Sequence, residues 1–174
     1  MLEYDVGSLY EYYYNDLYRY VYIMTLNSFD TEDILQNVFV KVIKGRKSFR
    51  GESSIKTWLF AIAHNECLTF LAKDKRKILV EYADNIRITL GCGADEILLQ
   101  KETVKILLNF IQEQEEPIKS LLILRLIEEK AFVEIGRILN KPDGWCRVNF
   151  FRMKKKMIDL LDNKKEMKEK PYEK

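Results

Sequence analysis

The chain has 174 residues, of which 47% are apolar, and its 29 Lys and Arg nearly balance its 27 Asp and Glu. This composition is rich enough in apolar residues for one large core or two small ones, and it excludes a disordered chain. No apolar run reaches the roughly 20 residues of a membrane span. The acidic start "MLEYDVGSLY" also lacks the features of an export signal. We therefore expect a cytoplasmic protein with no direct membrane insertion. Its three scattered cysteines predict reduced thiols rather than a disulfide framework.

The charges are distributed unevenly along the sequence. Residues 1–40 carry seven acidic residues and one Arg, whereas residues 41–56 and 141–156 each carry six basic residues and one acidic residue. Aromatic residues lie within or next to both basic stretches. Positive charge beside aromatic rings suits nucleic acid, so the sequence predicts two surfaces of this kind. Two merely solvated basic faces are the alternative.

Apolar residues recur at spacings of three and four almost throughout, and strict alternation is scarce, which predicts an all-α protein. The first helix is expected over about residues 7–27. A second should follow "FDTED", with Asp30 or Thr31 as its N-cap, and end near Gly45. A third, capped by Ser53 or Ser54, should run to about Leu71.

In the middle of the chain the apolar residues show no sustained helical spacing, and "GCG" stands at 91–93. This pattern predicts a linker. Helical spacing resumes beyond it, and Pro117 is placed to start another helix. The expected organisation is therefore two small helical domains, 1–77 and 96–161, joined by a flexible linker, 78–95, and followed by a disordered tail, 162–174.

The second domain contains a predicted helix-turn-helix. The segment "AFVEIGRIL", residues 131–139, is followed by the breaker "NKPDG" and by a helix from Gly144 with Asp143 as its cap. On that last helix an inward stripe is formed by Cys146, Phe150, Met153, Met157 and Leu160. The opposite face carries Trp145, Val148, Asn149, Arg152 and Lys156. A face of this composition can contact base edges and thymine methyl groups. Packing of Trp145 and Val148 on a neighbouring helix is the alternative.

The first basic stretch includes "KSFRGESSIKTWLF", residues 47–60. Here Phe49 and Trp58 stand among Lys47, Arg50 and Lys56. Such a surface can hold phosphates and stack unpaired bases, each stack contributing roughly 1–3 kcal/mol. Burial of both rings in the core is the competing interpretation, and we expect Trp58 to be partly buried.

Catalysis is not indicated by the sequence. Its single histidine, His64, stands three residues before Cys67, but no third thiol is near enough in sequence to complete a zinc site. No glycine-rich phosphate-binding motif is present. We expect that the protein is not an enzyme and that it binds no cofactor, metal ion or small-molecule substrate.

Two segments carry a resemblance to a known family. Residues 31–77, "TEDILQNVFVKVIKGRKSFRGESSIKTWLFAIAHNECLTFLAKDKRK", resemble the second conserved region of extracytoplasmic-function (ECF) sigma factors of the sigma-70 family. Residues 115–161, from "EEPIKSLLIL" to "MKKKMIDLL", resemble the fourth region of that family. The resemblance implies a subunit that brings bacterial RNA polymerase core to promoters and begins to open the duplex.

The resemblance also implies roles for individual residues. Docking on the clamp helices of the polymerase β′ subunit is implied for Asp33, Gln36, Asn37, Val40 and Lys41. Recognition and melting of the −10 element is implied for Lys47, Ser48, Phe49, Arg50, Ser53, Lys56, Trp58 and Asn65. Recognition of the −35 element is implied for Trp145, Arg147, Val148, Asn149, Arg152 and Lys156. The linker would thread the polymerase channel that nascent RNA later occupies, and an anti-sigma factor, often membrane-bound in this family, is an expected partner.

The sequence departs from the family pattern in two places. Asn37 stands where an acidic residue is usual, and "GWCRVN" replaces the usual small hydroxyl and basic residues at the start of the recognition helix. The promoter sequence therefore cannot be predicted.

Two other classes of protein fit part of the sequence. A helix-turn-helix repressor or activator would bind duplex DNA without polymerase core, and a recombinase would process DNA. The recombinase lacks an identifiable nucleophile, and a repressor has no need of the melting loop within 31–77. These features favour the sigma-factor interpretation.

Overall fold

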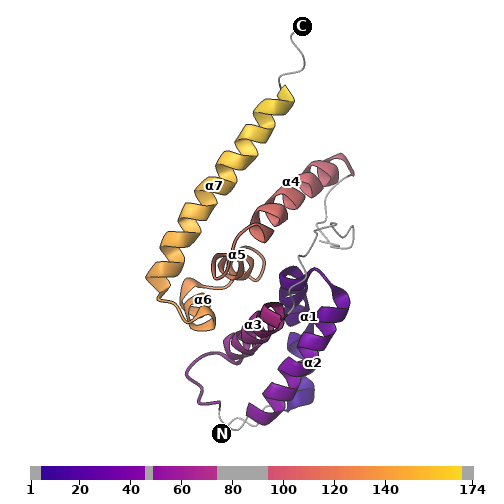
Figure 1. The fold of residues 1–174 in the computed structure, drawn as a ribbon, viewed down its shortest axis with the longest axis vertical. Coiled ribbons are helices and arrows are strands. Elements are labelled where there is room, and N and C mark those ends of the chain that lie inside the picture. Colours follow the sequence, from indigo (N-terminus) through magenta and orange to yellow (C-terminus); the bar gives the residue numbers. More distant parts are fainter. Residues whose placement is uncertain (1–4, 46–48, 74–93, 170–174) are drawn as a thin grey trace.

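The computed structural model describes residues 5–45, 49–73 and 94–169, the last range with side chains from 102 to 164. Over these residues all regular structure is α-helical, which confirms the predicted class (Figure 1). The helices are α1 (Val6–Thr25), α2 (Ser28–Gly45), α3 (Ile55–Lys73), α4 (Ala94–Gln112), α5 (Ile118–Leu126), α6 (Phe132–Leu139) and α7 (Asp143–Glu169).

The front half of the molecule consists of α1, α2 and α3, which pack against one another. Each helix turns one apolar face inward, and the fully buried side chains include Leu17, Tyr20, Val38, Leu59 and Phe60. The start of α3 is fixed by Ser54, whose hydroxyl accepts the Thr57 N–H at 3.1 Å. The cap is thus one of the two serines that the sequence indicated.

The corner between α1 and α2 differs from the prediction. Leu26 ends α1 with φ 53°, and the side-chain oxygen of Asn27 accepts the Asp30 N–H at 3.1 Å. The N-cap role therefore belongs to Asn27 rather than to Asp30 or Thr31. Thr31 is buried instead, where its hydroxyl donates to the Asn27 carbonyl at 2.6 Å and contacts the Thr25 hydroxyl at 2.9 Å.

The rear half consists of α4 to α7, with α6 and α7 forming the predicted helix-turn-helix. Pro117 stands at the N-cap position of α5, as its sequence position indicated. Of the predicted stripe, Cys146, Phe150, Met153 and Met157 are buried along α7, whereas Leu160 is half-buried. Repeated steps of four and three residues thus predicted the inner face of α7 correctly.

The ends of two rear helices lie outside the predicted bounds. Helix α7 continues to Glu169, so residues 162–169 are helical rather than part of a disordered tail. These residues are mostly good helix formers, and no Pro or Gly interrupts them before Pro171. Figure 1 shows this long helix projecting beyond the other elements. Helix α4 starts at Ala94, two residues before the expected domain boundary.

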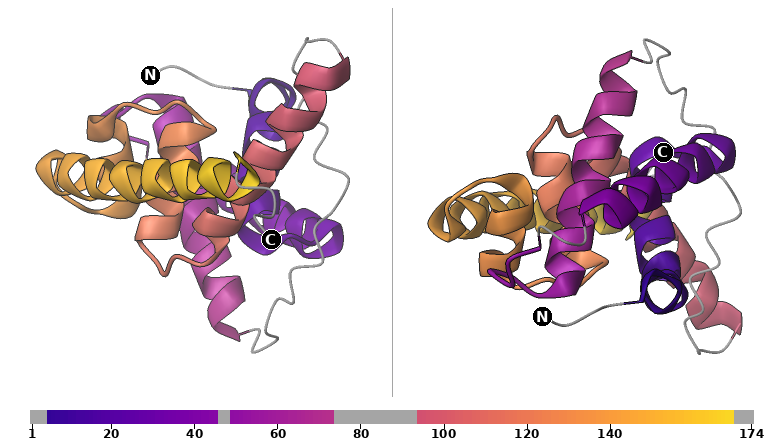
Figure 2. Two further views of the ribbon diagram at one scale, coloured as in Figure 1. Left: turned by 90° about the horizontal axis from the view of Figure 1, so that it is seen from above. Right: turned by 90° about the horizontal axis from the view of Figure 1, so that it is seen from below.

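The two halves pack directly on each other. Helix α3 contacts α6, and α1 contacts α5. The buried apolar residues of both halves form one continuous cluster. Figure 2 shows α7 lying across the molecule, on the side of α6 away from the front helices. The front and rear helices, which the sequence assigned to two domains, share one core in this structure.

Candidate nucleic-acid interface

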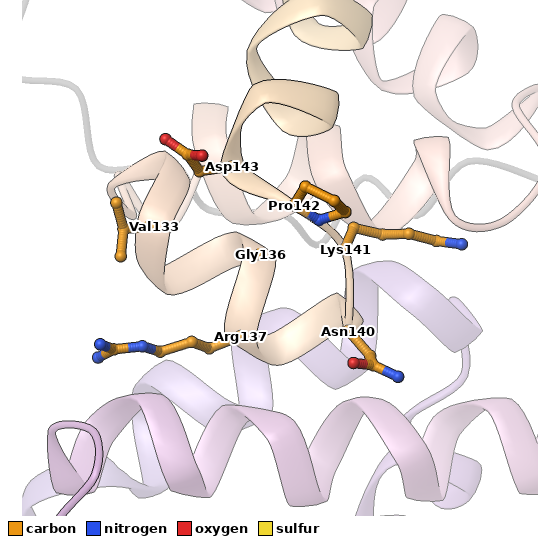
Figure 3. A pocket seen from close by; sticks show the side chains of 7 residues that line it. All are labelled: Val133, Gly136, Arg137, Asn140, Lys141, Pro142 and Asp143. Carbon is orange, nitrogen blue, oxygen red and sulfur yellow. The ribbon is translucent and has the colours of Figure 1, made fainter.

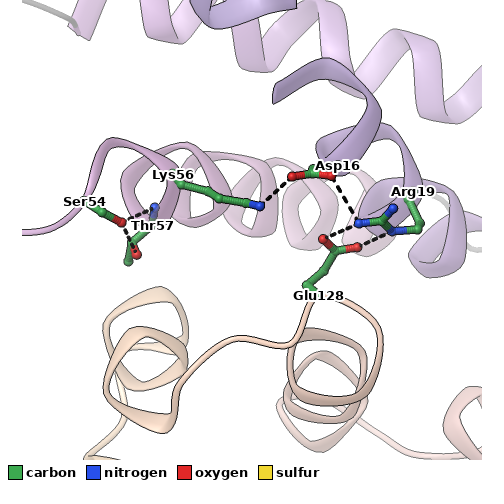
Figure 4. A network of polar contacts seen from close by, with 6 residues as sticks. All are labelled: Asp16, Arg19, Ser54, Lys56, Thr57 and Glu128. Atoms are coloured by element: carbon green, nitrogen blue, oxygen red, sulfur yellow. Dashed lines mark hydrogen bonds and ion pairs between the residues drawn. The ribbon is translucent and has the colours of Figure 1, made fainter. Parts of the chain in front are cut away.

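A chain of ion pairs joins the halves on one side of the molecule (Figure 4). Arg19 of α1 donates to both carboxylate oxygens of Glu128, which follows α5, from Nε at 2.7 Å and from Nη2 at 2.9 Å. Arg19 also pairs with Asp16 at 3.2 Å, and the Lys56 ammonium of α3 reaches Asp16 at 2.5 Å. Partial burial raises the pKa of Asp16, but Lys56 and Arg19 outweigh this and leave the pKa below its usual value.

A second contact between the halves is buried. The Tyr20 hydroxyl lies 3.0 Å from Nδ1 of His64 and donates to the Ser120 hydroxyl at 3.2 Å. Burial lowers the pKa of His64 to about 4, so this histidine is neutral at neutral pH. Burial also raises the pKa of the Cys67 thiol. These groups hold α1, α3 and α5 together and offer neither an exposed base nor a reactive thiol.

The predicted front surface is partly assembled around an aromatic pair. The rings of Phe49 and Trp58 lie 5.2 Å apart, and both side chains are half-buried. Partial burial of Trp58 agrees with the prediction. Asn65 is exposed two helical turns further along the same side of α3, and Arg50 is exposed beside Phe49. Ser53 is half-buried in the same loop, while Lys47 and Ser48 lie outside the described residues.

Lys56 is not part of this surface. It precedes Trp58 by two residues, which places the two side chains on opposite sides of α3. The Lys56 ammonium faces α1, where it pairs with Asp16. The sequence grouped it with Phe49 and Trp58 because of its proximity along the chain, which is a poor guide inside a helix.

The predicted polymerase-facing residues all lie exposed on α2, namely Asp33, Gln36, Asn37, Val40 and Lys41. The Lys41 ammonium forms an ion pair with the Glu66 carboxylate of α3. Lys41 therefore lies at the side of this face, next to α3.

The predicted DNA-reading face of α7 is accessible. Val148 is 58% exposed, and Arg152 and Lys156 are exposed beside it. Trp145 and Asn149 are half-buried at the edge of this face. The Asn149 amide donates to the Trp145 carbonyl of its own helix at 2.9 Å. The Arg152 cation, the Val148 side chain and the edge of Trp145 thus lie together on one helix. Groups of these kinds can contact base edges and methyl groups in a major groove.

Arg147 lies to the side of that face, next to a residue that the sequence analysis missed. Its guanidinium pairs with Asp143 at 3.4 Å and lies 5.2 Å from the Phe132 ring centroid. The missed residue, Phe151, is 58% exposed, and its ring lies 5.7 Å from that of Phe150. Adjacent residues of a helix point about 100° apart, so only one member of this "FF" pair could face the core.

The turn between α6 and α7 forms an open pocket lined by Val133, Gly136, Arg137, Asn140, Lys141, Pro142 and Asp143. Figure 3 shows the side chains of Arg137 and Lys141 pointing to opposite sides of this turn. Gly136 packs against the Lys141 backbone, whose N–H donates to the Gly136 carbonyl at 2.9 Å. The turn therefore places Arg137, Lys141 and Asp143 near the start of α7.

The described parts of the chain hold neither a metal site nor a membrane-spanning helix. Over residues 5–45, 49–73 and 94–169, no group of three His, Cys, Asp or Glu residues could hold a metal ion. In these same ranges no helix is both long and apolar enough to cross a membrane. Cys67 and Cys146 are buried and free, whereas Cys92 lies outside the described residues.

Comparison with known proteins shows the family of this chain. Residues 9–77 match the family model for sigma-70 region 2. The chain is 32% identical over 143 residues to RNA polymerase sigma factor YlaC of Bacillus subtilis, covering 81% of this chain and 80% of that protein. It is 30% identical over 146 residues to the ECF RNA polymerase sigma-E factor of Haemophilus influenzae, covering 78% and 74% of the two chains.

Solved structures show the same fold. The sigma factor RpoE of Bartonella quintana, crystallised with the anti-sigma factor NepR, matches with a TM-score of 0.67 at 15% identity, covering 90% of this chain and 96% of that one. CnrH, in complex with the cytosolic domain of CnrY, matches with a TM-score of 0.65 at 16% identity, covering 91% and 88%. The chain therefore belongs to the ECF sigma factors of the sigma-70 family, non-enzymatic subunits that direct RNA polymerase to promoters.

Proposed function

We propose that this sigma factor divides promoter recognition between its two halves. The front surface around Phe49, Trp58 and Asn65 captures unpaired bases of the −10 element. The exposed face of α7 around Val148 and Arg152 reads the −35 element as intact duplex. The main support is that both surfaces remain accessible although the halves share a core. Each combines basic or amide groups with apolar contact area, as strand capture and groove reading require.

Simultaneous use of both surfaces requires the halves to separate. Elements centred about 25 base pairs apart lie about 85 Å apart on B-DNA at 3.4 Å per base pair. A compact chain of this length has a radius of gyration of only about 16 Å. Residues 74–93 connect α3 to α4. At about 3.3 Å per residue, a connection of this length allows the two halves to move far apart while they stay joined. The packed arrangement is thus a state that precedes full promoter engagement.

The partners follow from the same proposal. The exposed face of α2 around Asp33, Gln36 and Val40 docks on the clamp helices of the polymerase core, with Asn37 and Lys41 at its edge. The protein acts in the cytoplasm, where polymerase and promoter DNA are found. We include an anti-sigma factor among its partners because the structural relative RpoE of Bartonella quintana was solved with the anti-sigma factor NepR.

Replacing Arg152 by Ala should weaken −35-dependent initiation about tenfold or more, because a lost base or phosphate contact costs roughly 1–3 kcal/mol. Affinity for polymerase core should not change, since α7 lies on the opposite half from α2. Transcription assays on promoters with and without a −35 element, combined with core-binding titrations, test this.

Lys164→Ala is the matched control, because it removes an exposed cation about three turns further along the same helix. It should initiate like the natural protein. Equal losses of initiation and core affinity in Arg152→Ala would contradict the assigned role of α7.

A further inference from the structure

Phe29 has the highest exposure among the large apolar side chains of the described residues. It is 81% exposed at the second residue of α2. At about 100° per residue, it falls within about 40° of Asp33, Gln36, Val40 and Ile43. Val40 and Ile43 are themselves 46% and 52% exposed. An apolar line therefore runs along the whole outer side of α2, interrupted by one acidic and one amide residue.

Packing among the described residues does not account for this line. The inner side of α2 already supplies its core contacts through Ile34, Leu35, Val38 and Val42, each at most 2% exposed. Among the described helices, the main contacts of α2 are with α1 and α3, and Phe29, Val40 and Ile43 all remain exposed. An apolar line that the fold leaves uncovered is characteristic of an interaction surface.

The corner before α2 holds the backbone of Phe29 in place. Thr25 and Thr31 bond to each other across this corner, and both are buried. Asn27 receives the Asp30 N–H on its side chain and the Thr31 hydroxyl on its carbonyl. These bonds bracket Phe29 on both sides. A side chain presented on an ordered backbone loses less conformational freedom on binding, which favours affinity.

We propose that Phe29 is an aromatic anchor for RNA polymerase core, extending the docking face of α2 by one turn beyond Asp33. This inference rests on the proposed function of α2. The occupant is polymerase core because the apolar line is continuous with the residues assigned to core docking. Val40 and Ile43 flank the same contact at the other end of α2.

The neighbouring charges describe the complementary surface. Glu32 and Asp33 are exposed close to Phe29, whereas Lys44 is exposed at the other end of the line. The partner surface should therefore present an apolar recess for the Phe29 ring with a basic group beside it. Buried aromatic anchors of this kind commonly dominate the energy of an interface.

The test measures binding of full-length protein to purified RNA polymerase core. Phe29→Ala should weaken binding about tenfold or more, a size typical of a truncated anchor. Phe29→Leu should restore most of the affinity because it refills an apolar recess, and Ile43→Ala should weaken binding less than Phe29→Ala. The matched control is Tyr12→Ala, which removes a ring that is 79% exposed on α1. Its affinity should equal that of the natural protein.

The outcomes separate this inference from the function on which it rests. Thermal unfolding of Phe29→Ala should match that of the natural protein, since an exposed ring contributes little to the core. Unchanged core binding by Phe29→Ala, or an equal loss in Tyr12→Ala, would overturn the anchor. If the natural protein itself did not bind core, the proposed docking role of α2 would fail instead.

Discussion

Gly136→Ala should destabilise the rear half by about 3 kcal/mol and abolish binding to −35 duplex DNA. A Cβ at this position would lie 2.5 Å from the Lys141 carbonyl oxygen, a backbone atom that cannot rotate away. The helix-turn-helix corner would have to open, and overpacking of this kind costs typically 1–3 kcal/mol and occasionally more. For a chain of this size we expect the melting temperature to fall by about 6–12 °C. Thermal unfolding and −35 duplex titrations measure the two effects.

Gly144→Ala is the control for this substitution. A Cβ there meets nothing within 4 Å, and the residue is the second of α7. Ala is a better helix former than Gly, so this variant should be more stable by about 0.5–1 kcal/mol. A Gly136→Ala protein that unfolded at the natural temperature and bound DNA normally would show that the turn is less tightly packed than the structure indicates.

Arg19→Ala should loosen the packing of the two halves. It removes both hydrogen bonds to Glu128, whose side chain is only 1% exposed, and leaves that carboxylate without its guanidinium partner. Breaking a fully buried ion pair costs about 3–5 kcal/mol, but Arg19 is itself 48% exposed, so solvent screening reduces the expected loss to about 2 kcal/mol. Thermal unfolding gives the stability, and the radius of gyration from X-ray scattering should increase as the halves separate.

The contrasting variant is Arg147→Ala. Its ion pair with Asp143 has a distance of 3.4 Å, and both side chains are about half exposed. This pair and the contact of Arg147 with the Phe132 ring each contribute about 1 kcal/mol at most, and both lie within the rear half, so the radius of gyration should not change. If Arg19→Ala behaved in the same way as Arg147→Ala, the ion pairs in Figure 4 would not hold the halves together.

The helices of this protein were largely predictable because most have apolar residues at helical spacing and their own start and stop signals. Pro117 and Gly45 each marked a helix boundary correctly. The N-cap of α2 was misplaced because four potential capping residues, Asn27, Ser28, Asp30 and Thr31, lie close together in sequence. Buried hydrogen bonds to Thr25 decide among them, and these depend on how α1 packs against α2.

The packing of the halves was not predicted, although the sequence carried one sign of it. The run Leu121–Leu124 is buried at every position, so α5 is apolar on all sides there. A helix of this kind must be covered from several directions, and α1 and α7 both pack against it. Periodicity alone assigns each helix a single inner face, and it cannot identify which other helices complete the cover.

Some site residues were predictable from the sequence and others were not, for the same physical reason. Val148 and Arg152 were assigned correctly to an accessible face because both lie on one helix whose period is known. Lys56 was grouped with Trp58 by sequence proximity, and its ion pair with Asp16 could not be foreseen. Such a pair joins residues far apart in sequence. Phe29 and Phe151 were missed because apolar residues were assigned to the core by default.

The proposed division of promoter recognition between the two halves is tested most directly by reconstituted transcription. Two templates are compared, a fully duplex promoter and the same promoter with its −10 element already unpaired. Purified core polymerase with this protein should produce discrete transcripts from promoter fragments, where core alone gives none. Phe49→Ala should reduce transcription from the duplex promoter roughly tenfold or more, because one base stack contributes about 1–3 kcal/mol, and it should have much less effect when the −10 element is already unpaired. The proposed division of promoter recognition would be contradicted if the natural protein gave no promoter-directed transcripts. It would also be contradicted if Phe49→Ala reduced transcription equally on both templates.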